Sequence, residues 1–570
     1  MHTYQMQKLA EICFRQGITQ FVISPGSRSA PITLALARHP GINVRMIIDE
    51  RSAAFIALGI ALKTKNPVGL VCTSGTAAYN YAPAIAEAFF QQIPLLLFTA
   101  DRPPEWIDQQ DGQTIRQSNL YGKHVKAFYE LPSERAHQDV NWHFDRIINE
   151  SIITSKDLPA GPVHINVPLR EPLYPQKENK VELPPVQVIG KLQSESNLDA
   201  KSWQEVIDLW QQHQKILLVA GQYEFDSKLT DALTHFDQTP LVGDIISNLH
   251  PLATTIRRPD IILNHSHDNL KKDLQPDLLI TFGKSIISKS LKLFLRKFKP
   301  KAHIHIQPFL PVADTYQSLS QIIPMHPASF FEHLHGQLNT HHISINANKD
   351  YNQLWQHLSE KAHQLIYQFA PQFNSEFEAV KRVMQFLPID SCLCLANSMA
   401  IRYANFVALN QDQKYISVYA NRGTSGIDGS SSTALGIALS TYRQVTLITG
   451  DLAFFYDRNA FWHQYPFSNL RVIVLNNHGG GIFRMIDGPA EQPELETYFE
   501  TPHQLNAYHT ASEMGFEYYH CKDILNLDSI LEVFFEPEAK PKLLEIETDK
   551  KLNKEVFVQF KKEINKIYGT

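Results

Sequence analysis

The hexapeptide Ala57-Leu58-Gly59-Ile60-Ala61-Leu62 occurs a second time, unchanged, as Ala434-Leu435-Gly436-Ile437-Ala438-Leu439. The second copy lies 377 positions after the first (434 minus 57), and the same offset aligns two apolar segments without a gap. Val68-Gly69-Leu70-Val71 falls on Val445-Thr446-Leu447-Ile448, and Leu95-Leu96-Leu97 falls on Val472-Ile473-Val474. A hexapeptide rich in Ala and Leu can match by chance, but a helix and two strands in one register indicate a duplication. The sequence therefore predicts similar folds for the first and last parts of the chain.

Short runs of Val, Ile and Leu, each followed by a segment of helical length, recur along the whole chain. Such runs are typical of parallel sheets that are buried on both faces, so we predict an α/β protein built from doubly wound parallel sheets. Polar stretches near residues 175–201 and 339–352 divide the runs into three groups. We therefore expect three domains, at residues 1–185, 195–345 and 355–570, with the first and third similar to each other.

The composition is that of an ordered protein without a bias toward nucleic acid. Of the 570 residues, 43% are hydrophobic and 19% are charged, the net charge is −5, and neither sign of charge forms a long block. No apolar run approaches the ~18 residues of a membrane span, and the start lacks the basic and apolar segments of a signal peptide. Five cysteines without a Cys-x-x-Cys pair favour reduced, buried thiols. We expect a cytoplasmic protein that binds neither nucleic acid nor membrane.

Two small-residue turns follow strands that we expect in the first domain. They are Ser24-Pro25-Gly26-Ser27-Arg28-Ser29 and Thr73-Ser74-Gly75-Thr76. Turns at the carboxyl ends of parallel strands, with free backbone N–H groups, suit anionic ligands, although ordinary turns with helix caps are the alternative interpretation. Glu50, within Asp49-Glu50-Arg51, opens the helix that contains Ala57. Its carboxylate either has a chemical role or caps that helix.

Two loops of the third domain carry oxygen ligands for a metal ion. One expected strand ends in Gly450-Asp451, and the next ends in Asn476-Asn477-His478-Gly479-Gly480-Gly481. The duplication places both loops at the same edge of the sheet. A carboxylate, an amide oxygen and a backbone carbonyl suit Mg²⁺ that also holds diphosphate oxygens, and a run of glycines lets the backbone approach phosphate closely.

Gly-Asp is followed by Asn-Asn, with Asn477 26 positions after Asp451 (477 minus 451), and this pattern resembles the metal–diphosphate motif of thiamin diphosphate enzymes. Finer matches resemble one family of that class, the 2-succinyl-5-enolpyruvyl-6-hydroxy-3-cyclohexene-1-carboxylate (SEPHCHC) synthases of menaquinone synthesis. The matching segments are Ile23–Ser29, Asp49–Arg51, Thr73–Ala77, Thr99–Glu105, Ile115–Gln117, Asn421–Gly429 and, more weakly, Gly283–Lys289. The resemblance is dense in the first and third domains and thin in the middle one.

The resemblance implies a pyrimidine-binding first domain, a central domain and a diphosphate-binding third domain. The implied reaction is decarboxylation of 2-oxoglutarate and addition of a succinyl carbanion equivalent to isochorismate, with thiamin diphosphate and Mg²⁺ or Mn²⁺ as cofactors. Because a dimer or tetramer is also implied, we expect sites shared between chains.

The resemblance also implies roles for particular residues. Catalytic roles fall to Glu50, Gln113 and Arg28, and metal ligation falls to Asp451, Asn477 and the Gly479 carbonyl. The remaining cofactor-binding residues are Ser24, Pro25, Gly26, Ser74, Gly75, Ser398, Ile427, Gly450, Leu452, Gly480, Ile482 and Phe483. The substrate-binding residues are Ser27, Arg28, Arg102, Gln113, Lys289, Arg402, Arg422, Ile482, Phe483 and Ile486. Arginine guanidinium groups match carboxylates in pairs, which agrees with two dicarboxylate substrates.

Two positions depart from the family pattern, and some alternatives stay open. His478 and Gly481 stand where relatives carry Asn and Gln. A contact from such a side-chain amide to diphosphate or substrate is therefore not expected here. Another thiamin diphosphate-dependent 2-oxoacid decarboxylase or carboligase is the nearest alternative, and a catalytically silent protein of the same fold is a more distant one. The pairs His265/His267, His303/His305 and His333/His335 have no third ligand at suitable spacing, so we interpret them as surface histidines.

Overall fold

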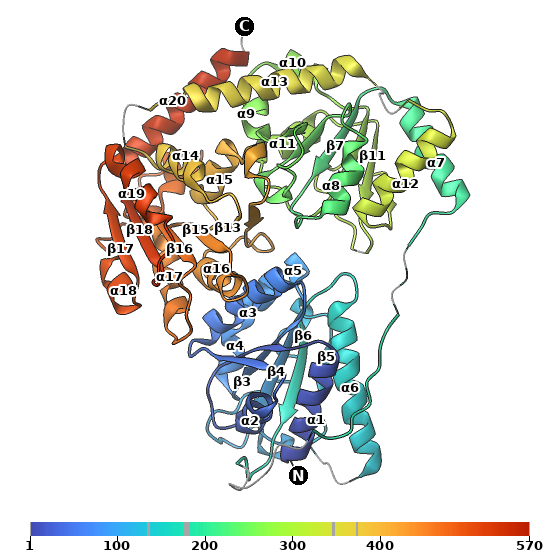
Figure 1. Ribbon diagram of the computed structural model, residues 1–570, viewed down its shortest axis with the longest axis vertical. Helices are drawn as coiled ribbons and strands as arrows, with labels where there is room; N and C mark the ends of the chain where they lie inside the picture. The colour runs from blue at the N-terminus through green and yellow to red at the C-terminus, as the bar shows by residue number, and fades with distance from the viewer. Residues whose placement is uncertain are drawn as a thin grey trace.

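The computed structural model describes residues 2–133, 137–174, 183–192, 194, 196–309, 311–344, 348–371 and 374–568. The chain forms three sheets, each with six parallel strands and helices on both faces (Figure 1). This arrangement confirms the predicted fold class. All five cysteines are buried and unpaired. Among the described residues, no helix is long and apolar enough to cross a membrane.

The first sheet has the strand order β2-β1-β3-β4-β6-β5. Its strands are β1 (Gln20–Ile23), β2 (Asn43–Met46), β3 (Val68–Cys72), β4 (Leu95–Asp101), β5 (Phe128–Glu130) and β6 (Val163–Pro168). Its helices are α1 (His2–Arg15), α2 (Ala30–Arg38), α3 (Glu50–Thr64), α4 (Thr76–Asn80), α5 (Ala82–Gln91) and α6 (Gln138–Lys156). The central strands β3 and β4 are buried along their whole length, as expected for apolar runs between two helical layers.

The third sheet repeats this topology, with the order β14-β13-β15-β16-β18-β17. Its strands are β13 (Ser391–Leu395), β14 (Ser417–Tyr419), β15 (Gln444–Gly450), β16 (Leu470–Asn476), β17 (Glu517–Cys521) and β18 (Lys542–Glu547). Its helices are α14 (Glu376–Phe386), α15 (Met399–Val407), α16 (Ser430–Ala438), α17 (Asp451–Tyr456), α18 (Tyr508–Glu513), α19 (Leu527–Phe534) and α20 (Lys550–Tyr568). The strands that the duplication equates, β3 with β15 and β4 with β16, hold equivalent places in the two sheets, so the predicted similarity is confirmed.

The two copies of the hexapeptide lie in α3 and α16, and these helices pack against each other (Figure 1). A Cβ atom on Gly59 would lie 2.1 Å from the Thr433 carbonyl oxygen, and one on Gly436 would lie 2.1 Å from the Ile56 carbonyl oxygen. Only glycine permits such an approach of two helix backbones. The duplicated sequence is therefore a contact between the first and third domains of this chain, buried within one apolar core.

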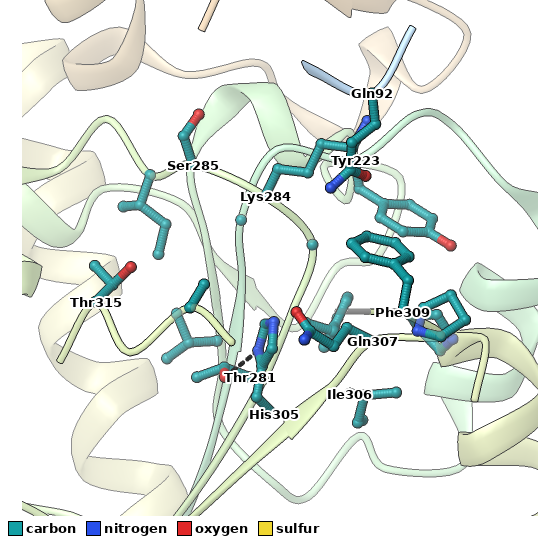
Figure 2. A pocket seen from close by; sticks show the side chains of 18 of the residues that line it. Gln92, Tyr223, Thr281, Lys284, Ser285, His305, Ile306, Gln307, Phe309 and Thr315 are labelled. Atoms are coloured by element: carbon teal, nitrogen blue, oxygen red, sulfur yellow. Dashed lines mark hydrogen bonds between the residues drawn. The ribbon is translucent and has the colours of Figure 1, made fainter. Parts of the chain in front are cut away.

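The central sheet has the order β12-β11-β10-β7-β8-β9. Its strands are β7 (Ile216–Ala220), β8 (Leu241–Gly243), β9 (Thr255–Ile256), β10 (Leu278–Phe282), β11 (Ala302–Ile306) and β12 (Gln321–Ile323). Its helices are α7 (Ala200–Gln212), α8 (Ser227–Thr234), α9 (Pro259–Leu263), α10 (Asp268–Asp273), α11 (Lys289–Lys297), α12 (Pro327–Thr340) and α13 (Lys349–Gln368). A cavity of about 410 Å³ lies at the carboxyl ends of β10 and β11, and its lining includes none of the residues predicted for catalysis. Figure 2 shows side chains that line it.

The prediction of surface histidines is wrong for three of the six. His303 and His305, at 1% and 9% exposure, lie on β11, which is covered by helices and by its neighbouring strands. The hydroxyl of Thr281 on β10 pairs with both rings, 2.9 Å from His303 Nε2 and 2.7 Å from His305 Nδ1 (Figure 2 shows the second bond). His265 is buried against Tyr568. A polar partner on another element makes such burial possible.

Candidate active site

Glu50 is the first residue of α3, and the side chain of Asp49 accepts a hydrogen bond from the Ser52 N–H as the helix cap. The cap is therefore Asp49, which leaves the Glu50 carboxylate available for another contact. Glu50 is half-buried, and its Oε2 lies 3.4 Å from the amide nitrogen of Asn80, which donates to it. The alternative interpretation of Glu50 as a helix cap thus has no support in the hydrogen bonds of α3.

The turns after β1 and β3 lie side by side at one edge of the first sheet. A Cβ atom on Gly26 would lie 2.2 Å from the Thr73 side chain, so the two turns touch. Gly75 has φ +87°, and its N–H donates to Gln117 Oε1 over 2.9 Å. Its Cα faces the backbone of Gln113, which a Cβ atom on Gly75 would approach to 3.3 Å. Ser24 is buried, whereas Pro25, Gly26 and Ser27 are exposed.

Arginines of the first domain surround a cavity of about 410 Å³ at the same edge. It is lined by Arg28, Arg102, Pro103, Trp106, Asp111, Arg170 and Glu171. Arg28 donates to the Leu169 carbonyl over 3.0 Å, and burial together with the nearby Arg102 lowers its pKa. Arg102 pairs with Asp111 and lies 3.4 Å from the Ser74 hydroxyl. The concentration of guanidinium groups favours an anionic ligand.

The third sheet brings the proposed metal ligands together at the ends of β15 and β16. Asp451 is 2% exposed, and its Oδ2 accepts a hydrogen bond of 2.9 Å from the Gly479 N–H. Gly479 has φ +158°, and a Cβ atom there would lie 2.7 Å from the Glu500 carbonyl oxygen. Asn477 Oδ1 is buried and has no partner in the described structure. An orphaned amide oxygen beside a buried carboxylate fits the hard oxygen ligands that Mg²⁺ prefers.

Two further side chains at this site were not predicted. Asn477 donates from Nδ2 to Glu376 Oε1 over 2.5 Å, and burial raises the pKa of Glu376 to about 8, although this hydrogen bond lowers it. His503 Nε2 lies 3.3 Å from Asp451 Oδ2. No group of three His, Cys, Asp or Glu side chains in the described part of the chain is arranged around one metal position. The proposed site instead combines one carboxylate, one amide and one carbonyl.

The loop from Asn421 to Gly429 is tied to the end of β13 by Asn397, another residue that sequence reasoning missed. Asn397 is 4% exposed, donates over 2.7 Å to each of the Asn421 and Gly426 carbonyls, and accepts from Arg422 over 2.8 Å. Arg402 donates to the Ser398 carbonyl over 2.5 Å. Ile427 is half-buried within this loop.

Lys289 is exposed and begins α11 of the central domain. Burial lowers the pKa of Lys292, on the same helix, and the charge of Arg422 lowers it further. Asp244 accepts from the N–H groups of Ile287 and Ser288 and from the Asn405 side chain of α15. The central domain therefore contributes one cationic side chain, Lys292, close to Arg422.

The predicted apolar wall follows the glycine run. Ile482 and Phe483 are half-buried, and Ile486 is 37% exposed. Phe483 packs against Phe499, with ring centroids 5.8 Å apart. Gly480 donates to the Glu500 carbonyl over 2.7 Å, while Gly450 has open space around its Cα and the Leu452 N–H donates to Asp451. The structure thus places these predicted residues around the loops after β15 and β16.

The first and third domains of the chain also meet next to these residues. Glu87 of α5, at 1% exposure, accepts from the N–H groups of Gly423 and Thr424 over 2.7 and 2.6 Å. Arg51 donates to the Tyr456 carbonyl at the end of α17 over 2.7 Å. The residue after Glu50 therefore contacts the helix that Asp451 begins.

Family models describe three parts of the chain. The N-terminal thiamine pyrophosphate binding domain of thiamine pyrophosphate enzymes matches residues 5–120, the middle domain of such enzymes matches residues 189–395, and the C-terminal thiamine pyrophosphate binding domain matches residues 397–546. The strand topology and these matches define the class: the chain is a thiamine pyrophosphate enzyme.

Curated relatives narrow this class. A 2-succinyl-5-enolpyruvyl-6-hydroxy-3-cyclohexene-1-carboxylate synthase from Cytophaga hutchinsonii is 46% identical over 566 residues, which cover 98% of this chain and 99% of the relative. The enzymes of the same name from Flavobacterium johnsoniae and Desulfotalea psychrophila are each 38% identical, over 98% and 95% of this chain and 98% and 97% of the relatives. The chain belongs to the SEPHCHC synthase family.

Proposed function

We propose that this chain decarboxylates 2-oxoglutarate and joins the remaining four-carbon unit to isochorismate, which gives SEPHCHC and CO₂ for menaquinone synthesis. Similarity to SEPHCHC synthases over almost the whole chain supports this reaction. Two groups of cationic side chains support the choice of substrates. One group surrounds Arg28 and Arg102, and the other surrounds Arg402 and Arg422. Both substrates are dicarboxylates, and guanidinium forks bind carboxylates in pairs.

Thiamin diphosphate, when bound, supplies a thiazolium carbon that accepts electrons as CO₂ leaves. We infer that Asp451, Asn477 and the Gly479 carbonyl hold Mg²⁺ or Mn²⁺, which neutralises the diphosphate. The orphaned oxygen of Asn477 and the buried carboxylate of Asp451 support this assignment. Ser398, Gly450, Leu452 and Gly480 would line the diphosphate, with Ile427, Ile482 and Phe483 against the rings.

Glu50 is the residue that we assign to proton transfer. A carboxylate at the N-terminus of a buried helix can hold a proton at a ring nitrogen of the aminopyrimidine and so promote loss of the proton from the thiazolium. Ser24, Pro25, Gly26, Ser74 and Gly75 supply the adjoining turns. Gln113 lies next to Gly75, which supports a role in orienting the substrate beside Ser27 and Arg28.

We assign the cationic side chains of the central and third domains to the carboxylates of one dicarboxylate substrate, and those around Arg28 and Arg102 to the other. Arg402 and Arg422 are joined to Ser398 and Asn397 by hydrogen bonds, which orient both guanidinium groups. Lys289 lies at the start of α11, where its ammonium adds a third positive charge. Ile486 continues the apolar wall that would shield the reacting carbons from water.

We also infer a dimer in which the first domain of one chain serves the third domain of its partner, and we place this enzyme in the cytoplasm. The described residues of 183–199 form neither helix nor strand, and Leu192 is 95% exposed (Figure 1 shows this connection along one side). A long connection lets the contact between α3 and α16 form between two chains, and exchange of identical elements is a frequent route to dimers. Ile48 and Tyr79, close to Glu50 and Asn80 in sequence, are 43% and 53% exposed, and a partner would cover them.

A product assay tests the reaction against the nearest alternative. We expect the protein, with thiamin diphosphate and Mg²⁺, to consume 2-oxoglutarate and isochorismate together and to release CO₂ and SEPHCHC. A related 2-oxoacid decarboxylase or carboligase would instead act on pyruvate alone. Turnover of pyruvate without turnover of the dicarboxylate pair would overturn the assignment.

A further inference from the structure

Glu376 is a buried acid beside the proposed metal site, and the chain holds it from two sides. It is the first residue of α14 and is 2% exposed. Its backbone N–H donates to the Asn553 side chain of α20 over 2.9 Å. The preceding residue, Ser375, caps α14 by accepting from the Glu378 N–H. With the backbone fixed on both sides, the carboxylate of Glu376 has a defined position.

The contact between Glu376 and Asn477 decides which way the Asn477 amide points. Asn477 Nδ2 donates to Glu376 Oε1 over 2.5 Å. Because Glu376 Oε1 is the acceptor of this hydrogen bond, the nitrogen end of the amide faces Glu376 and the oxygen is turned away. That oxygen is the buried atom without a partner. A buried amide oxygen without a hydrogen bond keeps its lone pairs free to bind a cation.

Gly481 adds a second observation on the same amide. A Cβ atom at position 481 would lie 2.9 Å from Asn477 Nδ2, closer than side-chain atoms normally approach. The glycine therefore leaves room for the amide nitrogen in the orientation that reaches Glu376. This contact gives a local structural reason for the glycine at position 481, where the family pattern has Gln.

We propose that Glu376 is a positioning residue that holds the Asn477 amide with its oxygen toward the metal ion. This inference rests on the proposed function, because the metal site is part of it. Groups that orient a metal ligand from behind are typically worth a factor of 10 to 100 in metal affinity.

Binding of Mn²⁺ tests the proposal without reference to turnover. The full-length protein with thiamin diphosphate is titrated with Mn²⁺, and free Mn²⁺ is followed by electron paramagnetic resonance. We expect Glu376→Gln to weaken Mn²⁺ binding by about 10- to 100-fold, since a glutamine amide can donate to Asn477 Oδ1 and reverse the Asn477 amide. Glu378→Gln is the matched control, because Glu378 lies on the same helix but pairs with Arg382, and parent-like affinity is expected there.

A reciprocal exchange separates positioning from packing. Asn477→Asp places two carboxylates in contact and should also weaken binding. The double variant Glu376→Gln with Asn477→Asp again pairs one amide with one carboxylate, now with the donor at position 376, and leaves an oxygen for the metal. We expect it to recover at least tenfold of the affinity that Glu376→Gln loses, which a packing defect would not allow.

The outcomes are distinguishable. Parent-like Mn²⁺ affinity in Glu376→Gln, with loss in Asp451→Ala, would overturn the positioning role and leave the metal site intact. Loss in Glu376→Gln without recovery in the double variant would also overturn it, because the effect would then be one of packing. Parent-like affinity in Asp451→Ala would show that the metal site itself is misplaced.

Discussion

At the scale of single residues, Asp451 and Asn477 show how a buried polar atom without a hydrogen bond can indicate a binding site. Both residues follow the ends of adjacent parallel strands. The two oxygens of Asp451 accept from the N–H groups of Gly479 and Leu452, and the nitrogen of Asn477 donates to Glu376. The remaining oxygen of Asn477 has no partner in the described structure. Leaving such an atom unsatisfied is unfavourable by about 1–3 kcal/mol, so a bound cation would relieve a penalty that the folded chain otherwise bears.

Removal of either proposed metal ligand should therefore abolish retention of the cofactor. In Asp451→Ala and Asn477→Ala we expect thiamin diphosphate with Mg²⁺ to bind at least ~100-fold more weakly, because the diphosphate charge loses its counter-ion. Isothermal titration calorimetry measures this directly. Binding as tight as in the parent, in either variant, would mean that the ligand set is wrong.

Glu50→Gln should keep the fold and the bound cofactor but slow proton transfer. Asp49 remains as the cap of α3, so the helix is not expected to lose stability. Loss of a positioned acid–base group typically slows a proton transfer by ~10²- to 10⁴-fold. Exchange of the thiazolium proton for deuterium reports the rate by nuclear magnetic resonance. An exchange rate equal to that of the parent would remove Glu50 from the mechanism.

Arg402→Ala and Arg422→Ala should weaken the use of an anionic substrate while leaving the cofactor affinity unchanged. A charge-assisted hydrogen bond is worth about 1.5–3 kcal/mol, so kcat/KM for one dicarboxylate should fall roughly 10- to 100-fold. Steady-state kinetics with each substrate varied in turn separates the two arginines. Unchanged kcat/KM for both substrates would argue against a substrate role for the arginine concerned.

At the scale of helices and strands, the sequence predicted those parts of the site in which a functional residue belongs to a short local motif after a strand. Asp451 and Asn477 each follow a buried strand directly, and Glu50 begins the helix that comes after β2, so the rule for carboxyl ends of parallel strands predicted their places at sheet edges. Their roles remain predictions. The same reasoning missed Glu376, which contacts Asn477 from 101 positions away and, as the first residue of a helix, has the pattern of a helix terminus.

The errors have a related cause. His303 and His305 alternate with apolar residues, a pattern that fits a strand exposed on one face. They are buried because β11 lies between β10 and β12 under helices, and Thr281 of β10 provides a hydrogen-bonding partner for both rings. Asn397 was likewise missed, since its partners lie in a loop more than twenty residues further along. Contacts between elements that are distant in sequence are not encoded in any local pattern.

Replacing glycine by alanine should change the stability in opposite directions at two sites, one in α12 and one at the crossing of α3 and α16. Glycine to alanine usually stabilises an exposed helix interior by ~0.5–1 kcal/mol, which we expect for Gly336→Ala in α12, where no atom lies within 4 Å of an added Cβ. In Gly59→Ala the added atom would meet a backbone carbonyl at 2.1 Å, so overpacking should lower stability by about 1–3 kcal/mol.

Both predicted changes in stability can be checked by thermal unfolding of the parent, Gly336→Ala and Gly59→Ala in parallel. The melting temperature should rise slightly for the first variant and fall for the second. A rise in Gly59→Ala similar to that in Gly336→Ala would contradict a tight helix crossing at this point.

At the scale of the whole molecule, the duplication has a consequence for how sites are assembled. Two domains with the same strand order meet through α3 and α16, and the meeting point carries Glu50 on one side and the loops of Asp451 and Ile427 on the other. The described residues between β6 and α7 form an extended connection. The same pairing of domains can therefore occur within one chain or between two, and a single-chain structure is compatible with both.

Co-expression of two inactive variants decides between these assemblies. In a dimer with exchanged first domains, a chain with Glu50→Gln and a chain with Asp451→Ala would form one site that carries both defects and one site that carries none. We therefore expect activity to return in purified mixed dimers, although each variant alone is inactive. Dimers of each single variant, prepared with the same two affinity tags, are the control. If the mixed dimers stayed as inactive as these controls, every site would have to combine the Glu50 and Asp451 of a single chain, and the extended connection would serve only to join the first domain to the central one.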